Sequence, residues 1–105
     1  MNDVVVQTSE GTLLFWCPGC RELHGVWLQA CPNPNGAWWL WNGSKELPTF
    51  NPSILVHGRV TAGRMVIPRC HSYVKDGRIQ FLSDCEHDKA GQTMMLPRNP
   101  LDCHA

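Results

Sequence analysis

Hydrophobic residues occur in short runs along the chain, and turn residues separate the runs. Nine glycines and eight prolines are spread over the 105 residues, which leaves room for short strands and little for long helices. The runs are rich in Val, Ile, Leu, Phe and Trp, as strands are. The pattern predicts a mostly β fold of short antiparallel strands, with a small α+β fold as the alternative. The predicted strands are 4–7, 12–16, 25–29, 37–41, 53–56, 65–67, 71–75, 78–82 and 93–96, and the single helix candidate is 85–91.

A two-residue turn between strand-like runs is the clearest local feature. Asp76-Gly77 suits a type I′ turn, whose twist matches that of the two strands it joins. The turn also sets the register of the hairpin, so that Lys75 lies opposite Arg78. We therefore predict an Asp-Gly hairpin at residues 71–82.

The predicted hairpin sorts chemically useful side chains onto its two faces. Side chains alternate between the faces of a strand, so Cys70 and Cys85 share one face while His71 and Asp84 share the other. In this register each pair consists of diagonal neighbours, which lie about 7–8 Å apart at Cα. That separation allows a shared metal ion on the first face and a hydrogen bond on the second.

Cysteine and histidine are unusually frequent, with six and five copies respectively. The length suits one domain, residues 1–105, and a core this small often needs a crosslink. The chain begins with Met1-Asn2-Asp3, which lacks the basic start and the apolar core of a secretory signal. We therefore expect a cytoplasmic protein that is crosslinked by a metal ion rather than by disulfides.

The motif C-x-x-C at residues 17–20 contains Pro-Gly, which forms a tight turn that directs both thiols at one cation. A structural zinc ion takes four Cys or His ligands in a tetrahedron, and the hairpin supplies two more cysteines on one face. The predicted zinc ligands are Cys17, Cys20, Cys70 and Cys85, with His24 and His87 as substitutes.

Three other interpretations of these residues stay open. The C-x-x-C motif also occurs in redox proteins, where it normally begins a helix. Isolated cysteines are often no more than small buried hydrophobic residues. A catalytic zinc ion could use His24, His71 and His87, although no H-E-x-x-H motif is present. Cys31 and Cys103 have no place in the predicted site.

A serine, a histidine and an aspartate form a second candidate constellation. A nucleophilic serine needs a histidine as general base and a carboxylate that orients the imidazole. His71 and Asp84 share a face of the predicted hairpin, and Ser53 begins an apolar run directly after a proline. We therefore consider Ser53, His71 and Asp84 as a catalytic triad. Each of these residues also has an ordinary structural role available in a strand or a turn.

Charge and hydropathy exclude two classes of partner. The nine basic and nine acidic residues give a formal net charge of zero, whereas nucleic-acid binding needs an excess of Lys and Arg. No apolar run approaches the roughly 20 residues that a membrane-spanning helix needs. We expect neither a nucleic acid nor a membrane as partner.

Three segments of the chain resemble a known family. They are 15–20 with His24, 48–54, and 70–91, which runs from Cys70-His71 through the Asp-Gly turn. The chain is similar over residues 12–96 to a small family of phage and bacterial proteins that are often labelled ammonia monooxygenase. Longer relatives in this family lie beside bacterial ubiquitin-like conjugation genes.

The resemblance implies a zinc-stabilised serine-type protease that acts on ubiquitin or a ubiquitin-like protein. Ser53 matches the serine of the family's Pro-Ser segment, and His71 matches its histidine. Cys17, Cys20 and Cys70 match metal-ligand cysteines of the family. Asp84 has no counterpart in the resemblance and depends on the hairpin register alone.

The expected activity is cleavage of the extended C-terminal tail of a ubiquitin-like protein, which strands rich in tryptophan would hold. One alternative is a zinc-ribbon-like interaction module without catalysis, such as a phage inhibitor of a host defence protein. A second alternative is a zinc-dependent hydrolase. Ser53 and His71 distinguish the first two, because only the enzyme needs them within hydrogen-bond distance.

Overall fold

The computed structural model describes residues 3–56, 59–61, 65–67 and 69–102, and these residues form strands and turns with no helix. The predicted mostly β fold of antiparallel strands is therefore confirmed. The strands are β1 (Val5–Gln7), β2 (Leu13–Cys17), β3 (Glu22–Val26), β4 (Leu40–Trp41), β5 (Phe50–Val56), β6 (Arg59–Thr61), β7 (Met65–Ile67), β8 (Cys70–Lys75), β9 (Arg78–Phe81) and β10 (Thr93–Met95).

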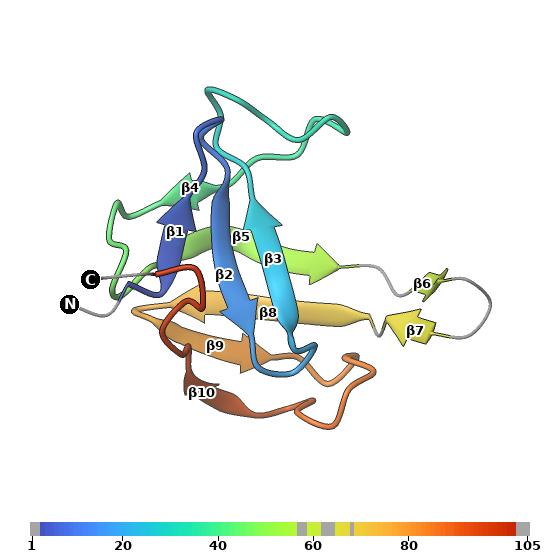
Figure 1. Ribbon diagram of the computed structural model, residues 1–105. Coiled ribbons are helices and arrows are strands. Elements are labelled where there is room, and N and C mark those ends of the chain that lie inside the picture. The colour runs from blue at the N-terminus through green and yellow to red at the C-terminus, as the bar shows by residue number, and fades with distance from the viewer. Residues whose placement is uncertain (1–2, 57–58, 62–64, 68, 103–105) are drawn as a thin grey trace.

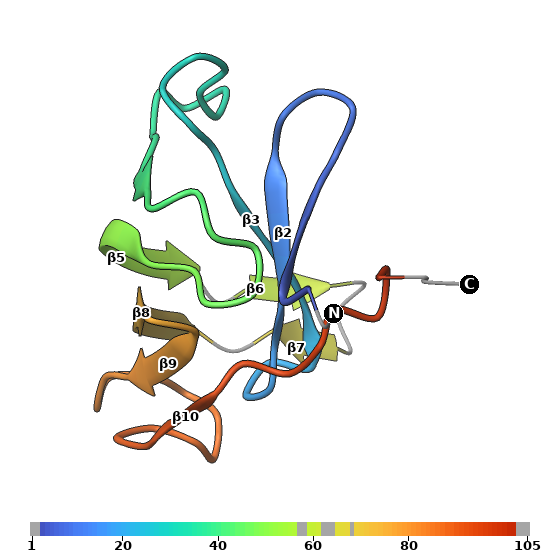
Figure 2. The same cartoon turned by 90° about the vertical axis from the view of Figure 1, so that its left-hand side faces the viewer.

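The strands form two larger sheets and one small ribbon, all antiparallel. One sheet has the order β1-β2-β3, the other has the order β10-β9-β8-β5-β4, and β6 pairs with β7 alone. The three-stranded sheet crosses the face of the five-stranded sheet (Figure 1), and the quarter-turned view separates the two layers (Figure 2). The β6-β7 ribbon extends beyond the ends of β5 and β8.

The core lies between the two sheets and consists of the inward side chains of each. Phe15 of the first sheet stacks on Phe50 of the second, with ring centroids 6.3 Å apart. Both rings are buried, as is Phe81 on β9. Along β2 and β8 the burial alternates residue by residue, so the opposite side chains of β8 face outward. The outer face of the five-stranded sheet is therefore free to carry a site.

The hairpin of β8 and β9 has the predicted turn and register. Lys75 pairs with Arg78, and Tyr73 pairs with Gln80. Both turn residues have positive φ, 51° at Asp76 and 78° at Gly77, as a type I′ turn requires. The prediction from the Asp-Gly dipeptide is confirmed.

Three predicted elements differ clearly from the structure, and one of them, the strand predicted at 37–41, is reduced to Leu40–Trp41. The helix candidate 85–91 consists of turns, in which Gln92 N–H donates to the Lys89 carbonyl at 3.0 Å. Seven residues are too few for a helix without strong packing, and Gly91 has a positive φ of 79°. The strand predicted at 25–29 lies at Glu22–Val26 instead, because the chain reverses directly after the C-x-x-C motif, with Arg21 at φ 57°.

A bulge interrupts the pairing of β5 with β8. Phe50 pairs with Val74 and Ile54 pairs with Ser72, so three residues of β5, 51–53, lie opposite the single residue Tyr73. Bulges change the direction of side chains and are common beside active sites. The peptide bond between residues 51 and 52 is cis. The bulge is the part of the fold that determines where the serine at position 53 points.

Candidate active site and metal centre

Ser53 and His71 lie within hydrogen-bond distance of each other. The Ser53 Oγ is 3.0 Å from the His71 Nε2. Ser53 comes from the bulge in β5 and His71 from the outward face of β8, where it alternates with buried Cys70 and Ser72. The distance is suitable for a hydroxyl that gives its proton to an imidazole.

Asp84 contacts the other nitrogen of the same imidazole. Its Oδ2 lies 3.2 Å from the His71 Nδ1. The side chain of His71 is 27% exposed and that of Asp84 is 45% exposed, so the pair lies at the surface rather than in the core. The structure thus brings Ser53, His71 and Asp84 together in the order that a catalytic triad requires.

The turn that carries Asp84 is attached to β8 by several hydrogen bonds. The Cys85 Sγ accepts from the His71 amide and donates to the His71 carbonyl, each at 3.2 Å. The Arg69 guanidinium donates twice to the Asp84 carbonyl at 3.2 Å, and the Arg69 amide donates to the Glu86 carboxylate at 2.7 Å. These contacts hold Asp84 against the strand that carries His71. Sequence reasoning assigned no such role to Arg69 or Glu86, because their contacts arise only when the turn folds back.

A group of metal-binding side chains lies on the opposite, inner side of β8. One ligand atom from each residue lies within 4.8 Å of all the others, and the residues are Cys17, Cys20, Cys70 and His87. The Cys17 and Cys70 sulfurs are 3.9 Å apart. A tetrahedral site with zinc–sulfur bonds of about 2.3 Å places its sulfurs about 3.8 Å apart. The four residues are close enough to hold a metal ion.

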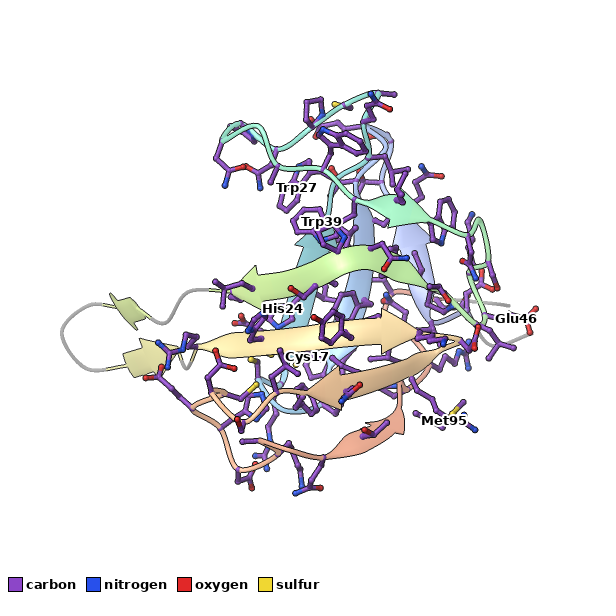
Figure 3. All side chains as sticks on the ribbon, turned by 180° about the vertical axis from the view of Figure 1, so that it is seen from behind. Cys17, His24, Trp27, Trp39, Glu46 and Met95 are labelled. Atoms are coloured by element: carbon purple, nitrogen blue, oxygen red, sulfur yellow. The ribbon has the colours of Figure 1, made fainter. Side chains whose placement is uncertain are left out.

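The metal group contains three of the four predicted cysteines together with His87, which was a predicted substitute. Cys85 lies outside this group, and its thiol bonds to the backbone of His71 instead. The chain turns back after Phe81, where the ladder of β9 ends, so the alternation that grouped Cys70 with Cys85 stops before it reaches Cys85. His24, the other substitute, is buried next to Cys17 (Figure 3) but is not one of the four.

The surroundings of His87 bear on its fit to a metal ion. Its Nε2 is buried and has no hydrogen-bond partner among the described residues, and an unsatisfied buried nitrogen is costly without a ligand. Its ring lies against Gly19, where a Cβ atom would overlap it. The glycine in the C-x-x-C turn therefore makes room for the imidazole.

The three thiols also have interdependent acidities. Hydrogen bonds from Cys20 and Cys70 lower the pKa of the Cys17 thiol, because they stabilise its thiolate, and His24 adds a smaller lowering. For Cys20 the hydrogen bond to Cys17 raises the pKa to about 12, and the pKa of Cys70 is raised for the same reason. Without a cation, the arrangement favours deprotonation of the Cys17 thiol and disfavours deprotonation of the Cys20 and Cys70 thiols. A divalent cation at the centre would stabilise all three.

The candidate triad and the metal group are joined through the backbone. Cys70 directly precedes His71 on β8, and His87 follows Asp84 by three residues in the turn. The two groups lie on opposite faces of the same strand. A metal ion held by Cys70 and His87 would therefore fasten the two segments that present His71 and Asp84.

Comparison with protein families adds a finding that is independent of this geometry. The family model for BubE, described as the bacterial ubiquitination-like system serine protease, matches residues 1–82. The chain belongs to the BubE family. The match contains Ser53 and His71, and the family's description as a serine protease agrees with their arrangement. It confirms the resemblance to proteins of bacterial ubiquitin-like conjugation systems.

The match to BubE ends before Asp84, Cys85 and His87, so their positions come from the structure alone.

No curated protein and no solved structure matches the chain. In the described part of the chain no helix is long and apolar enough to cross a membrane.

Proposed function

We propose that the protein is a serine-type peptidase that cleaves the C-terminal tail of ubiquitin or a ubiquitin-like protein. The observation that carries the proposal is the pair of contacts through His71, 3.0 Å to the Ser53 Oγ and 3.2 Å to the Asp84 Oδ2. An interaction module has no need of this alignment. Membership of the BubE family supports the same activity and the class of substrate.

In the proposed reaction Ser53 attacks the scissile carbonyl carbon. His71 Nε2 takes the hydroxyl proton and then gives it to the departing amine, while Asp84 holds the Nδ1 proton and stabilises the imidazolium. Water then attacks the acyl-enzyme with His71 as the base again, which releases the carboxylate product and restores the serine. Backbone N–H groups of the bulge at Ser53 are the candidates for the oxyanion hole.

We propose zinc as the metal, held by Cys17, Cys20, Cys70 and His87. Three thiolates and an imidazole complete a tetrahedron, which is the closed donor set of structural zinc sites. This favours a structural role over the alternative of a zinc-dependent hydrolase. His87 Nδ1 accepts from the Lys89 amide at 3.2 Å, so binding zinc through Nε2 would move the ring proton to Nδ1 and give up this contact.

The edge of β5 offers a place for an extended substrate. β4 pairs only with Phe50 and Asn51, and in the described part of the chain no strand pairs with the rest of β5 on that side. Trp39 lies beside this edge (Figure 3) and its indole N–H donates to the Ser53 carbonyl at 3.1 Å. Trp38 and Leu40 are exposed nearby. A tail that adds here as a strand would pass the Ser53 hydroxyl.

The test is an intact native mass spectrum after exposure to a serine-reactive fluorophosphonate. The expected result is one zinc ion per chain and one covalent adduct in the wild type. Ser53→Ala should keep the zinc ion and lose the adduct. Ser9→Ala, which removes an exposed serine far from His71 in sequence, should behave as the wild type.

Two outcomes would contradict the proposed activity. A zinc-bound protein that forms no adduct in the wild type would support the interaction module instead. An adduct that persists in Ser53→Ala would show that another residue is the nucleophile. A protein without zinc would refute the assignment of Cys17, Cys20, Cys70 and His87, while leaving the serine test to decide the activity.

A further inference from the structure

A hollow of about 580 Å³ lies on the outer face of the five-stranded sheet, and its lining includes residues of β5 and β8 that are close in sequence to Ser53 and His71. Asn51 precedes Ser53 by two positions, and Tyr73 follows His71 by two. The charged wall of the hollow comes from the β8-β9 hairpin around the turn. The polar residues that line it include Asn51, Tyr73, Lys75, Asp76, Arg78 and Gln80.

Two cations line this hollow directly opposite each other. Lys75 pairs with Arg78 across the turn and both side chains are exposed on the outer face. Like charges in opposite positions of a ladder destabilise it. Among the described residues neither cation has a carboxylate within ion-pair distance. The arrangement has a cost in the free protein that a bound anion would remove.

The hollow has one acidic side chain, that of Asp76, and this carboxylate already has a hydrogen-bond partner within the protein. The Asp76 carboxylate accepts from the Thr49 hydroxyl at 3.4 Å, and the Asp76 amide donates to the Thr49 Oγ1 at 2.9 Å. These bonds attach the turn to the segment before β5. Two cations against one carboxylate leave the wall with net positive charge, on a chain whose formal net charge is zero.

We propose that this hollow is a specificity site for an acidic side chain of the substrate, close to the scissile bond. The inference rests on the proposed peptidase function. Lys75 and Arg78 would bind the carboxylate of an Asp or Glu, while Tyr73, Gln80 and Asn51 offer hydrogen bonds at its edge. A carboxylate suits the paired cations because each can donate to one of its oxygens.

The position of the acidic residue follows from strand geometry. Lys75 is four residues beyond His71 on the same strand and the same face, a distance of about 13 Å at about 3.3 Å per residue. Lysine and arginine side chains are long enough to reach back from this point toward Tyr73. The carboxylate therefore belongs to a residue two to four positions from the scissile bond.

The test uses a library of internally quenched peptides with amidated C-termini, in which Glu or Gln is placed at each position around a randomised centre. Cleavage sites are read by mass spectrometry for the wild type and for the double variant Lys75→Gln, Arg78→Gln. Lys45→Gln, which removes an exposed lysine outside the hollow, is the charge control. Fluorophosphonate labelling of Ser53 is measured in parallel for all three proteins.

We expect the wild type and Lys45→Gln to prefer Glu over Gln by about 1.5-fold to fivefold at one position two to four residues from the cut, which is the range for an ion pair exposed to solvent. The preference should decline as salt is added and vanish in the double variant, whose labelling rate stays that of the wild type. Equal cleavage of Glu and Gln peptides by a wild type that labels normally would overturn the specificity site alone. Absence of labelling in the wild type would refute the peptidase on which it rests.

Discussion

The substitution Gly19→Ala tests the metal centre through a residue that is not a ligand. A Cβ atom at position 19 would overlap the His87 imidazole, so the ring must leave its place beside the three cysteines. The C-x-x-C motif itself stays intact, as do the thiols of Cys17 and Cys20. The substitution therefore removes one donor of four by displacement.

The expected size of the effect follows from the energy of zinc sites. Structural zinc binds with about 10–16 kcal/mol in small zinc-binding peptides, so an equal share for each of four donors is about 3 kcal/mol. At about 1.4 kcal/mol for each factor of ten, Gly19→Ala should weaken zinc binding by about a hundredfold. His87→Ala should weaken it by a similar factor, because both variants lose the same donor.

The assay is competition with a chromogenic chelator, together with the midpoint of thermal unfolding in the presence of zinc. Gly43→Ala is the control, since Gly43 has a positive φ of 84° and a Cβ atom at this position would meet no other atom within 4 Å. This variant carries backbone strain without touching His87 and should bind zinc as the wild type does. Zinc affinity of the wild-type level in Gly19→Ala would refute the placement of His87 in the metal group.

Two other substitutions separate the triad from the metal centre. Asp84→Asn keeps the shape of the side chain and removes its charge. It should slow fluorophosphonate labelling by about 10- to 1,000-fold, less than the roughly 10⁴-fold of a buried triad, because Asp84 is 45% exposed; an unchanged rate would contradict its orienting role. Cys85→Ala removes the thiol that bonds both backbone groups of His71 and should slow labelling without loss of zinc, whereas Cys70→Ala should lose zinc. Loss of zinc from Cys85→Ala would instead make Cys85 a ligand.

A metal ion bound by Cys70 and His87 would restrain the candidate triad, because the two sites share strand β8 and the turn after β9. Cys70 and His71 point to opposite faces of one strand because side chains alternate. His87 and Asp84 belong to one short turn. Zinc on the inner face would therefore restrain the outer face, although it has no contact with the substrate in this arrangement.

The sequence alone determined the features that depend on neighbouring residues. Hydrophobic runs between turn residues indicated the antiparallel strands, because burial of one face requires alternation. The Asp76-Gly77 dipeptide indicated the turn type and the register, since both residues accept positive φ. The register also predicted His71 near Asp84, but the ladder ends at Phe81, so the turn after β9 rather than the register holds Asp84 3.2 Å from the imidazole. The same local argument predicted the tight turn of the C-x-x-C motif.

Only the tertiary structure decided which distant side chains meet. The bulge in β5 aligns Ser53 with His71, and no pattern in the sequence marks its two extra residues. The chain turns back after Phe81, which brings His87 to the cysteines and leaves Cys85 on the backbone of His71. The alternation of side chains is a property of a continuing strand. Where the strand ends, the packing of the turn against β8 determines which side chain reaches the metal group.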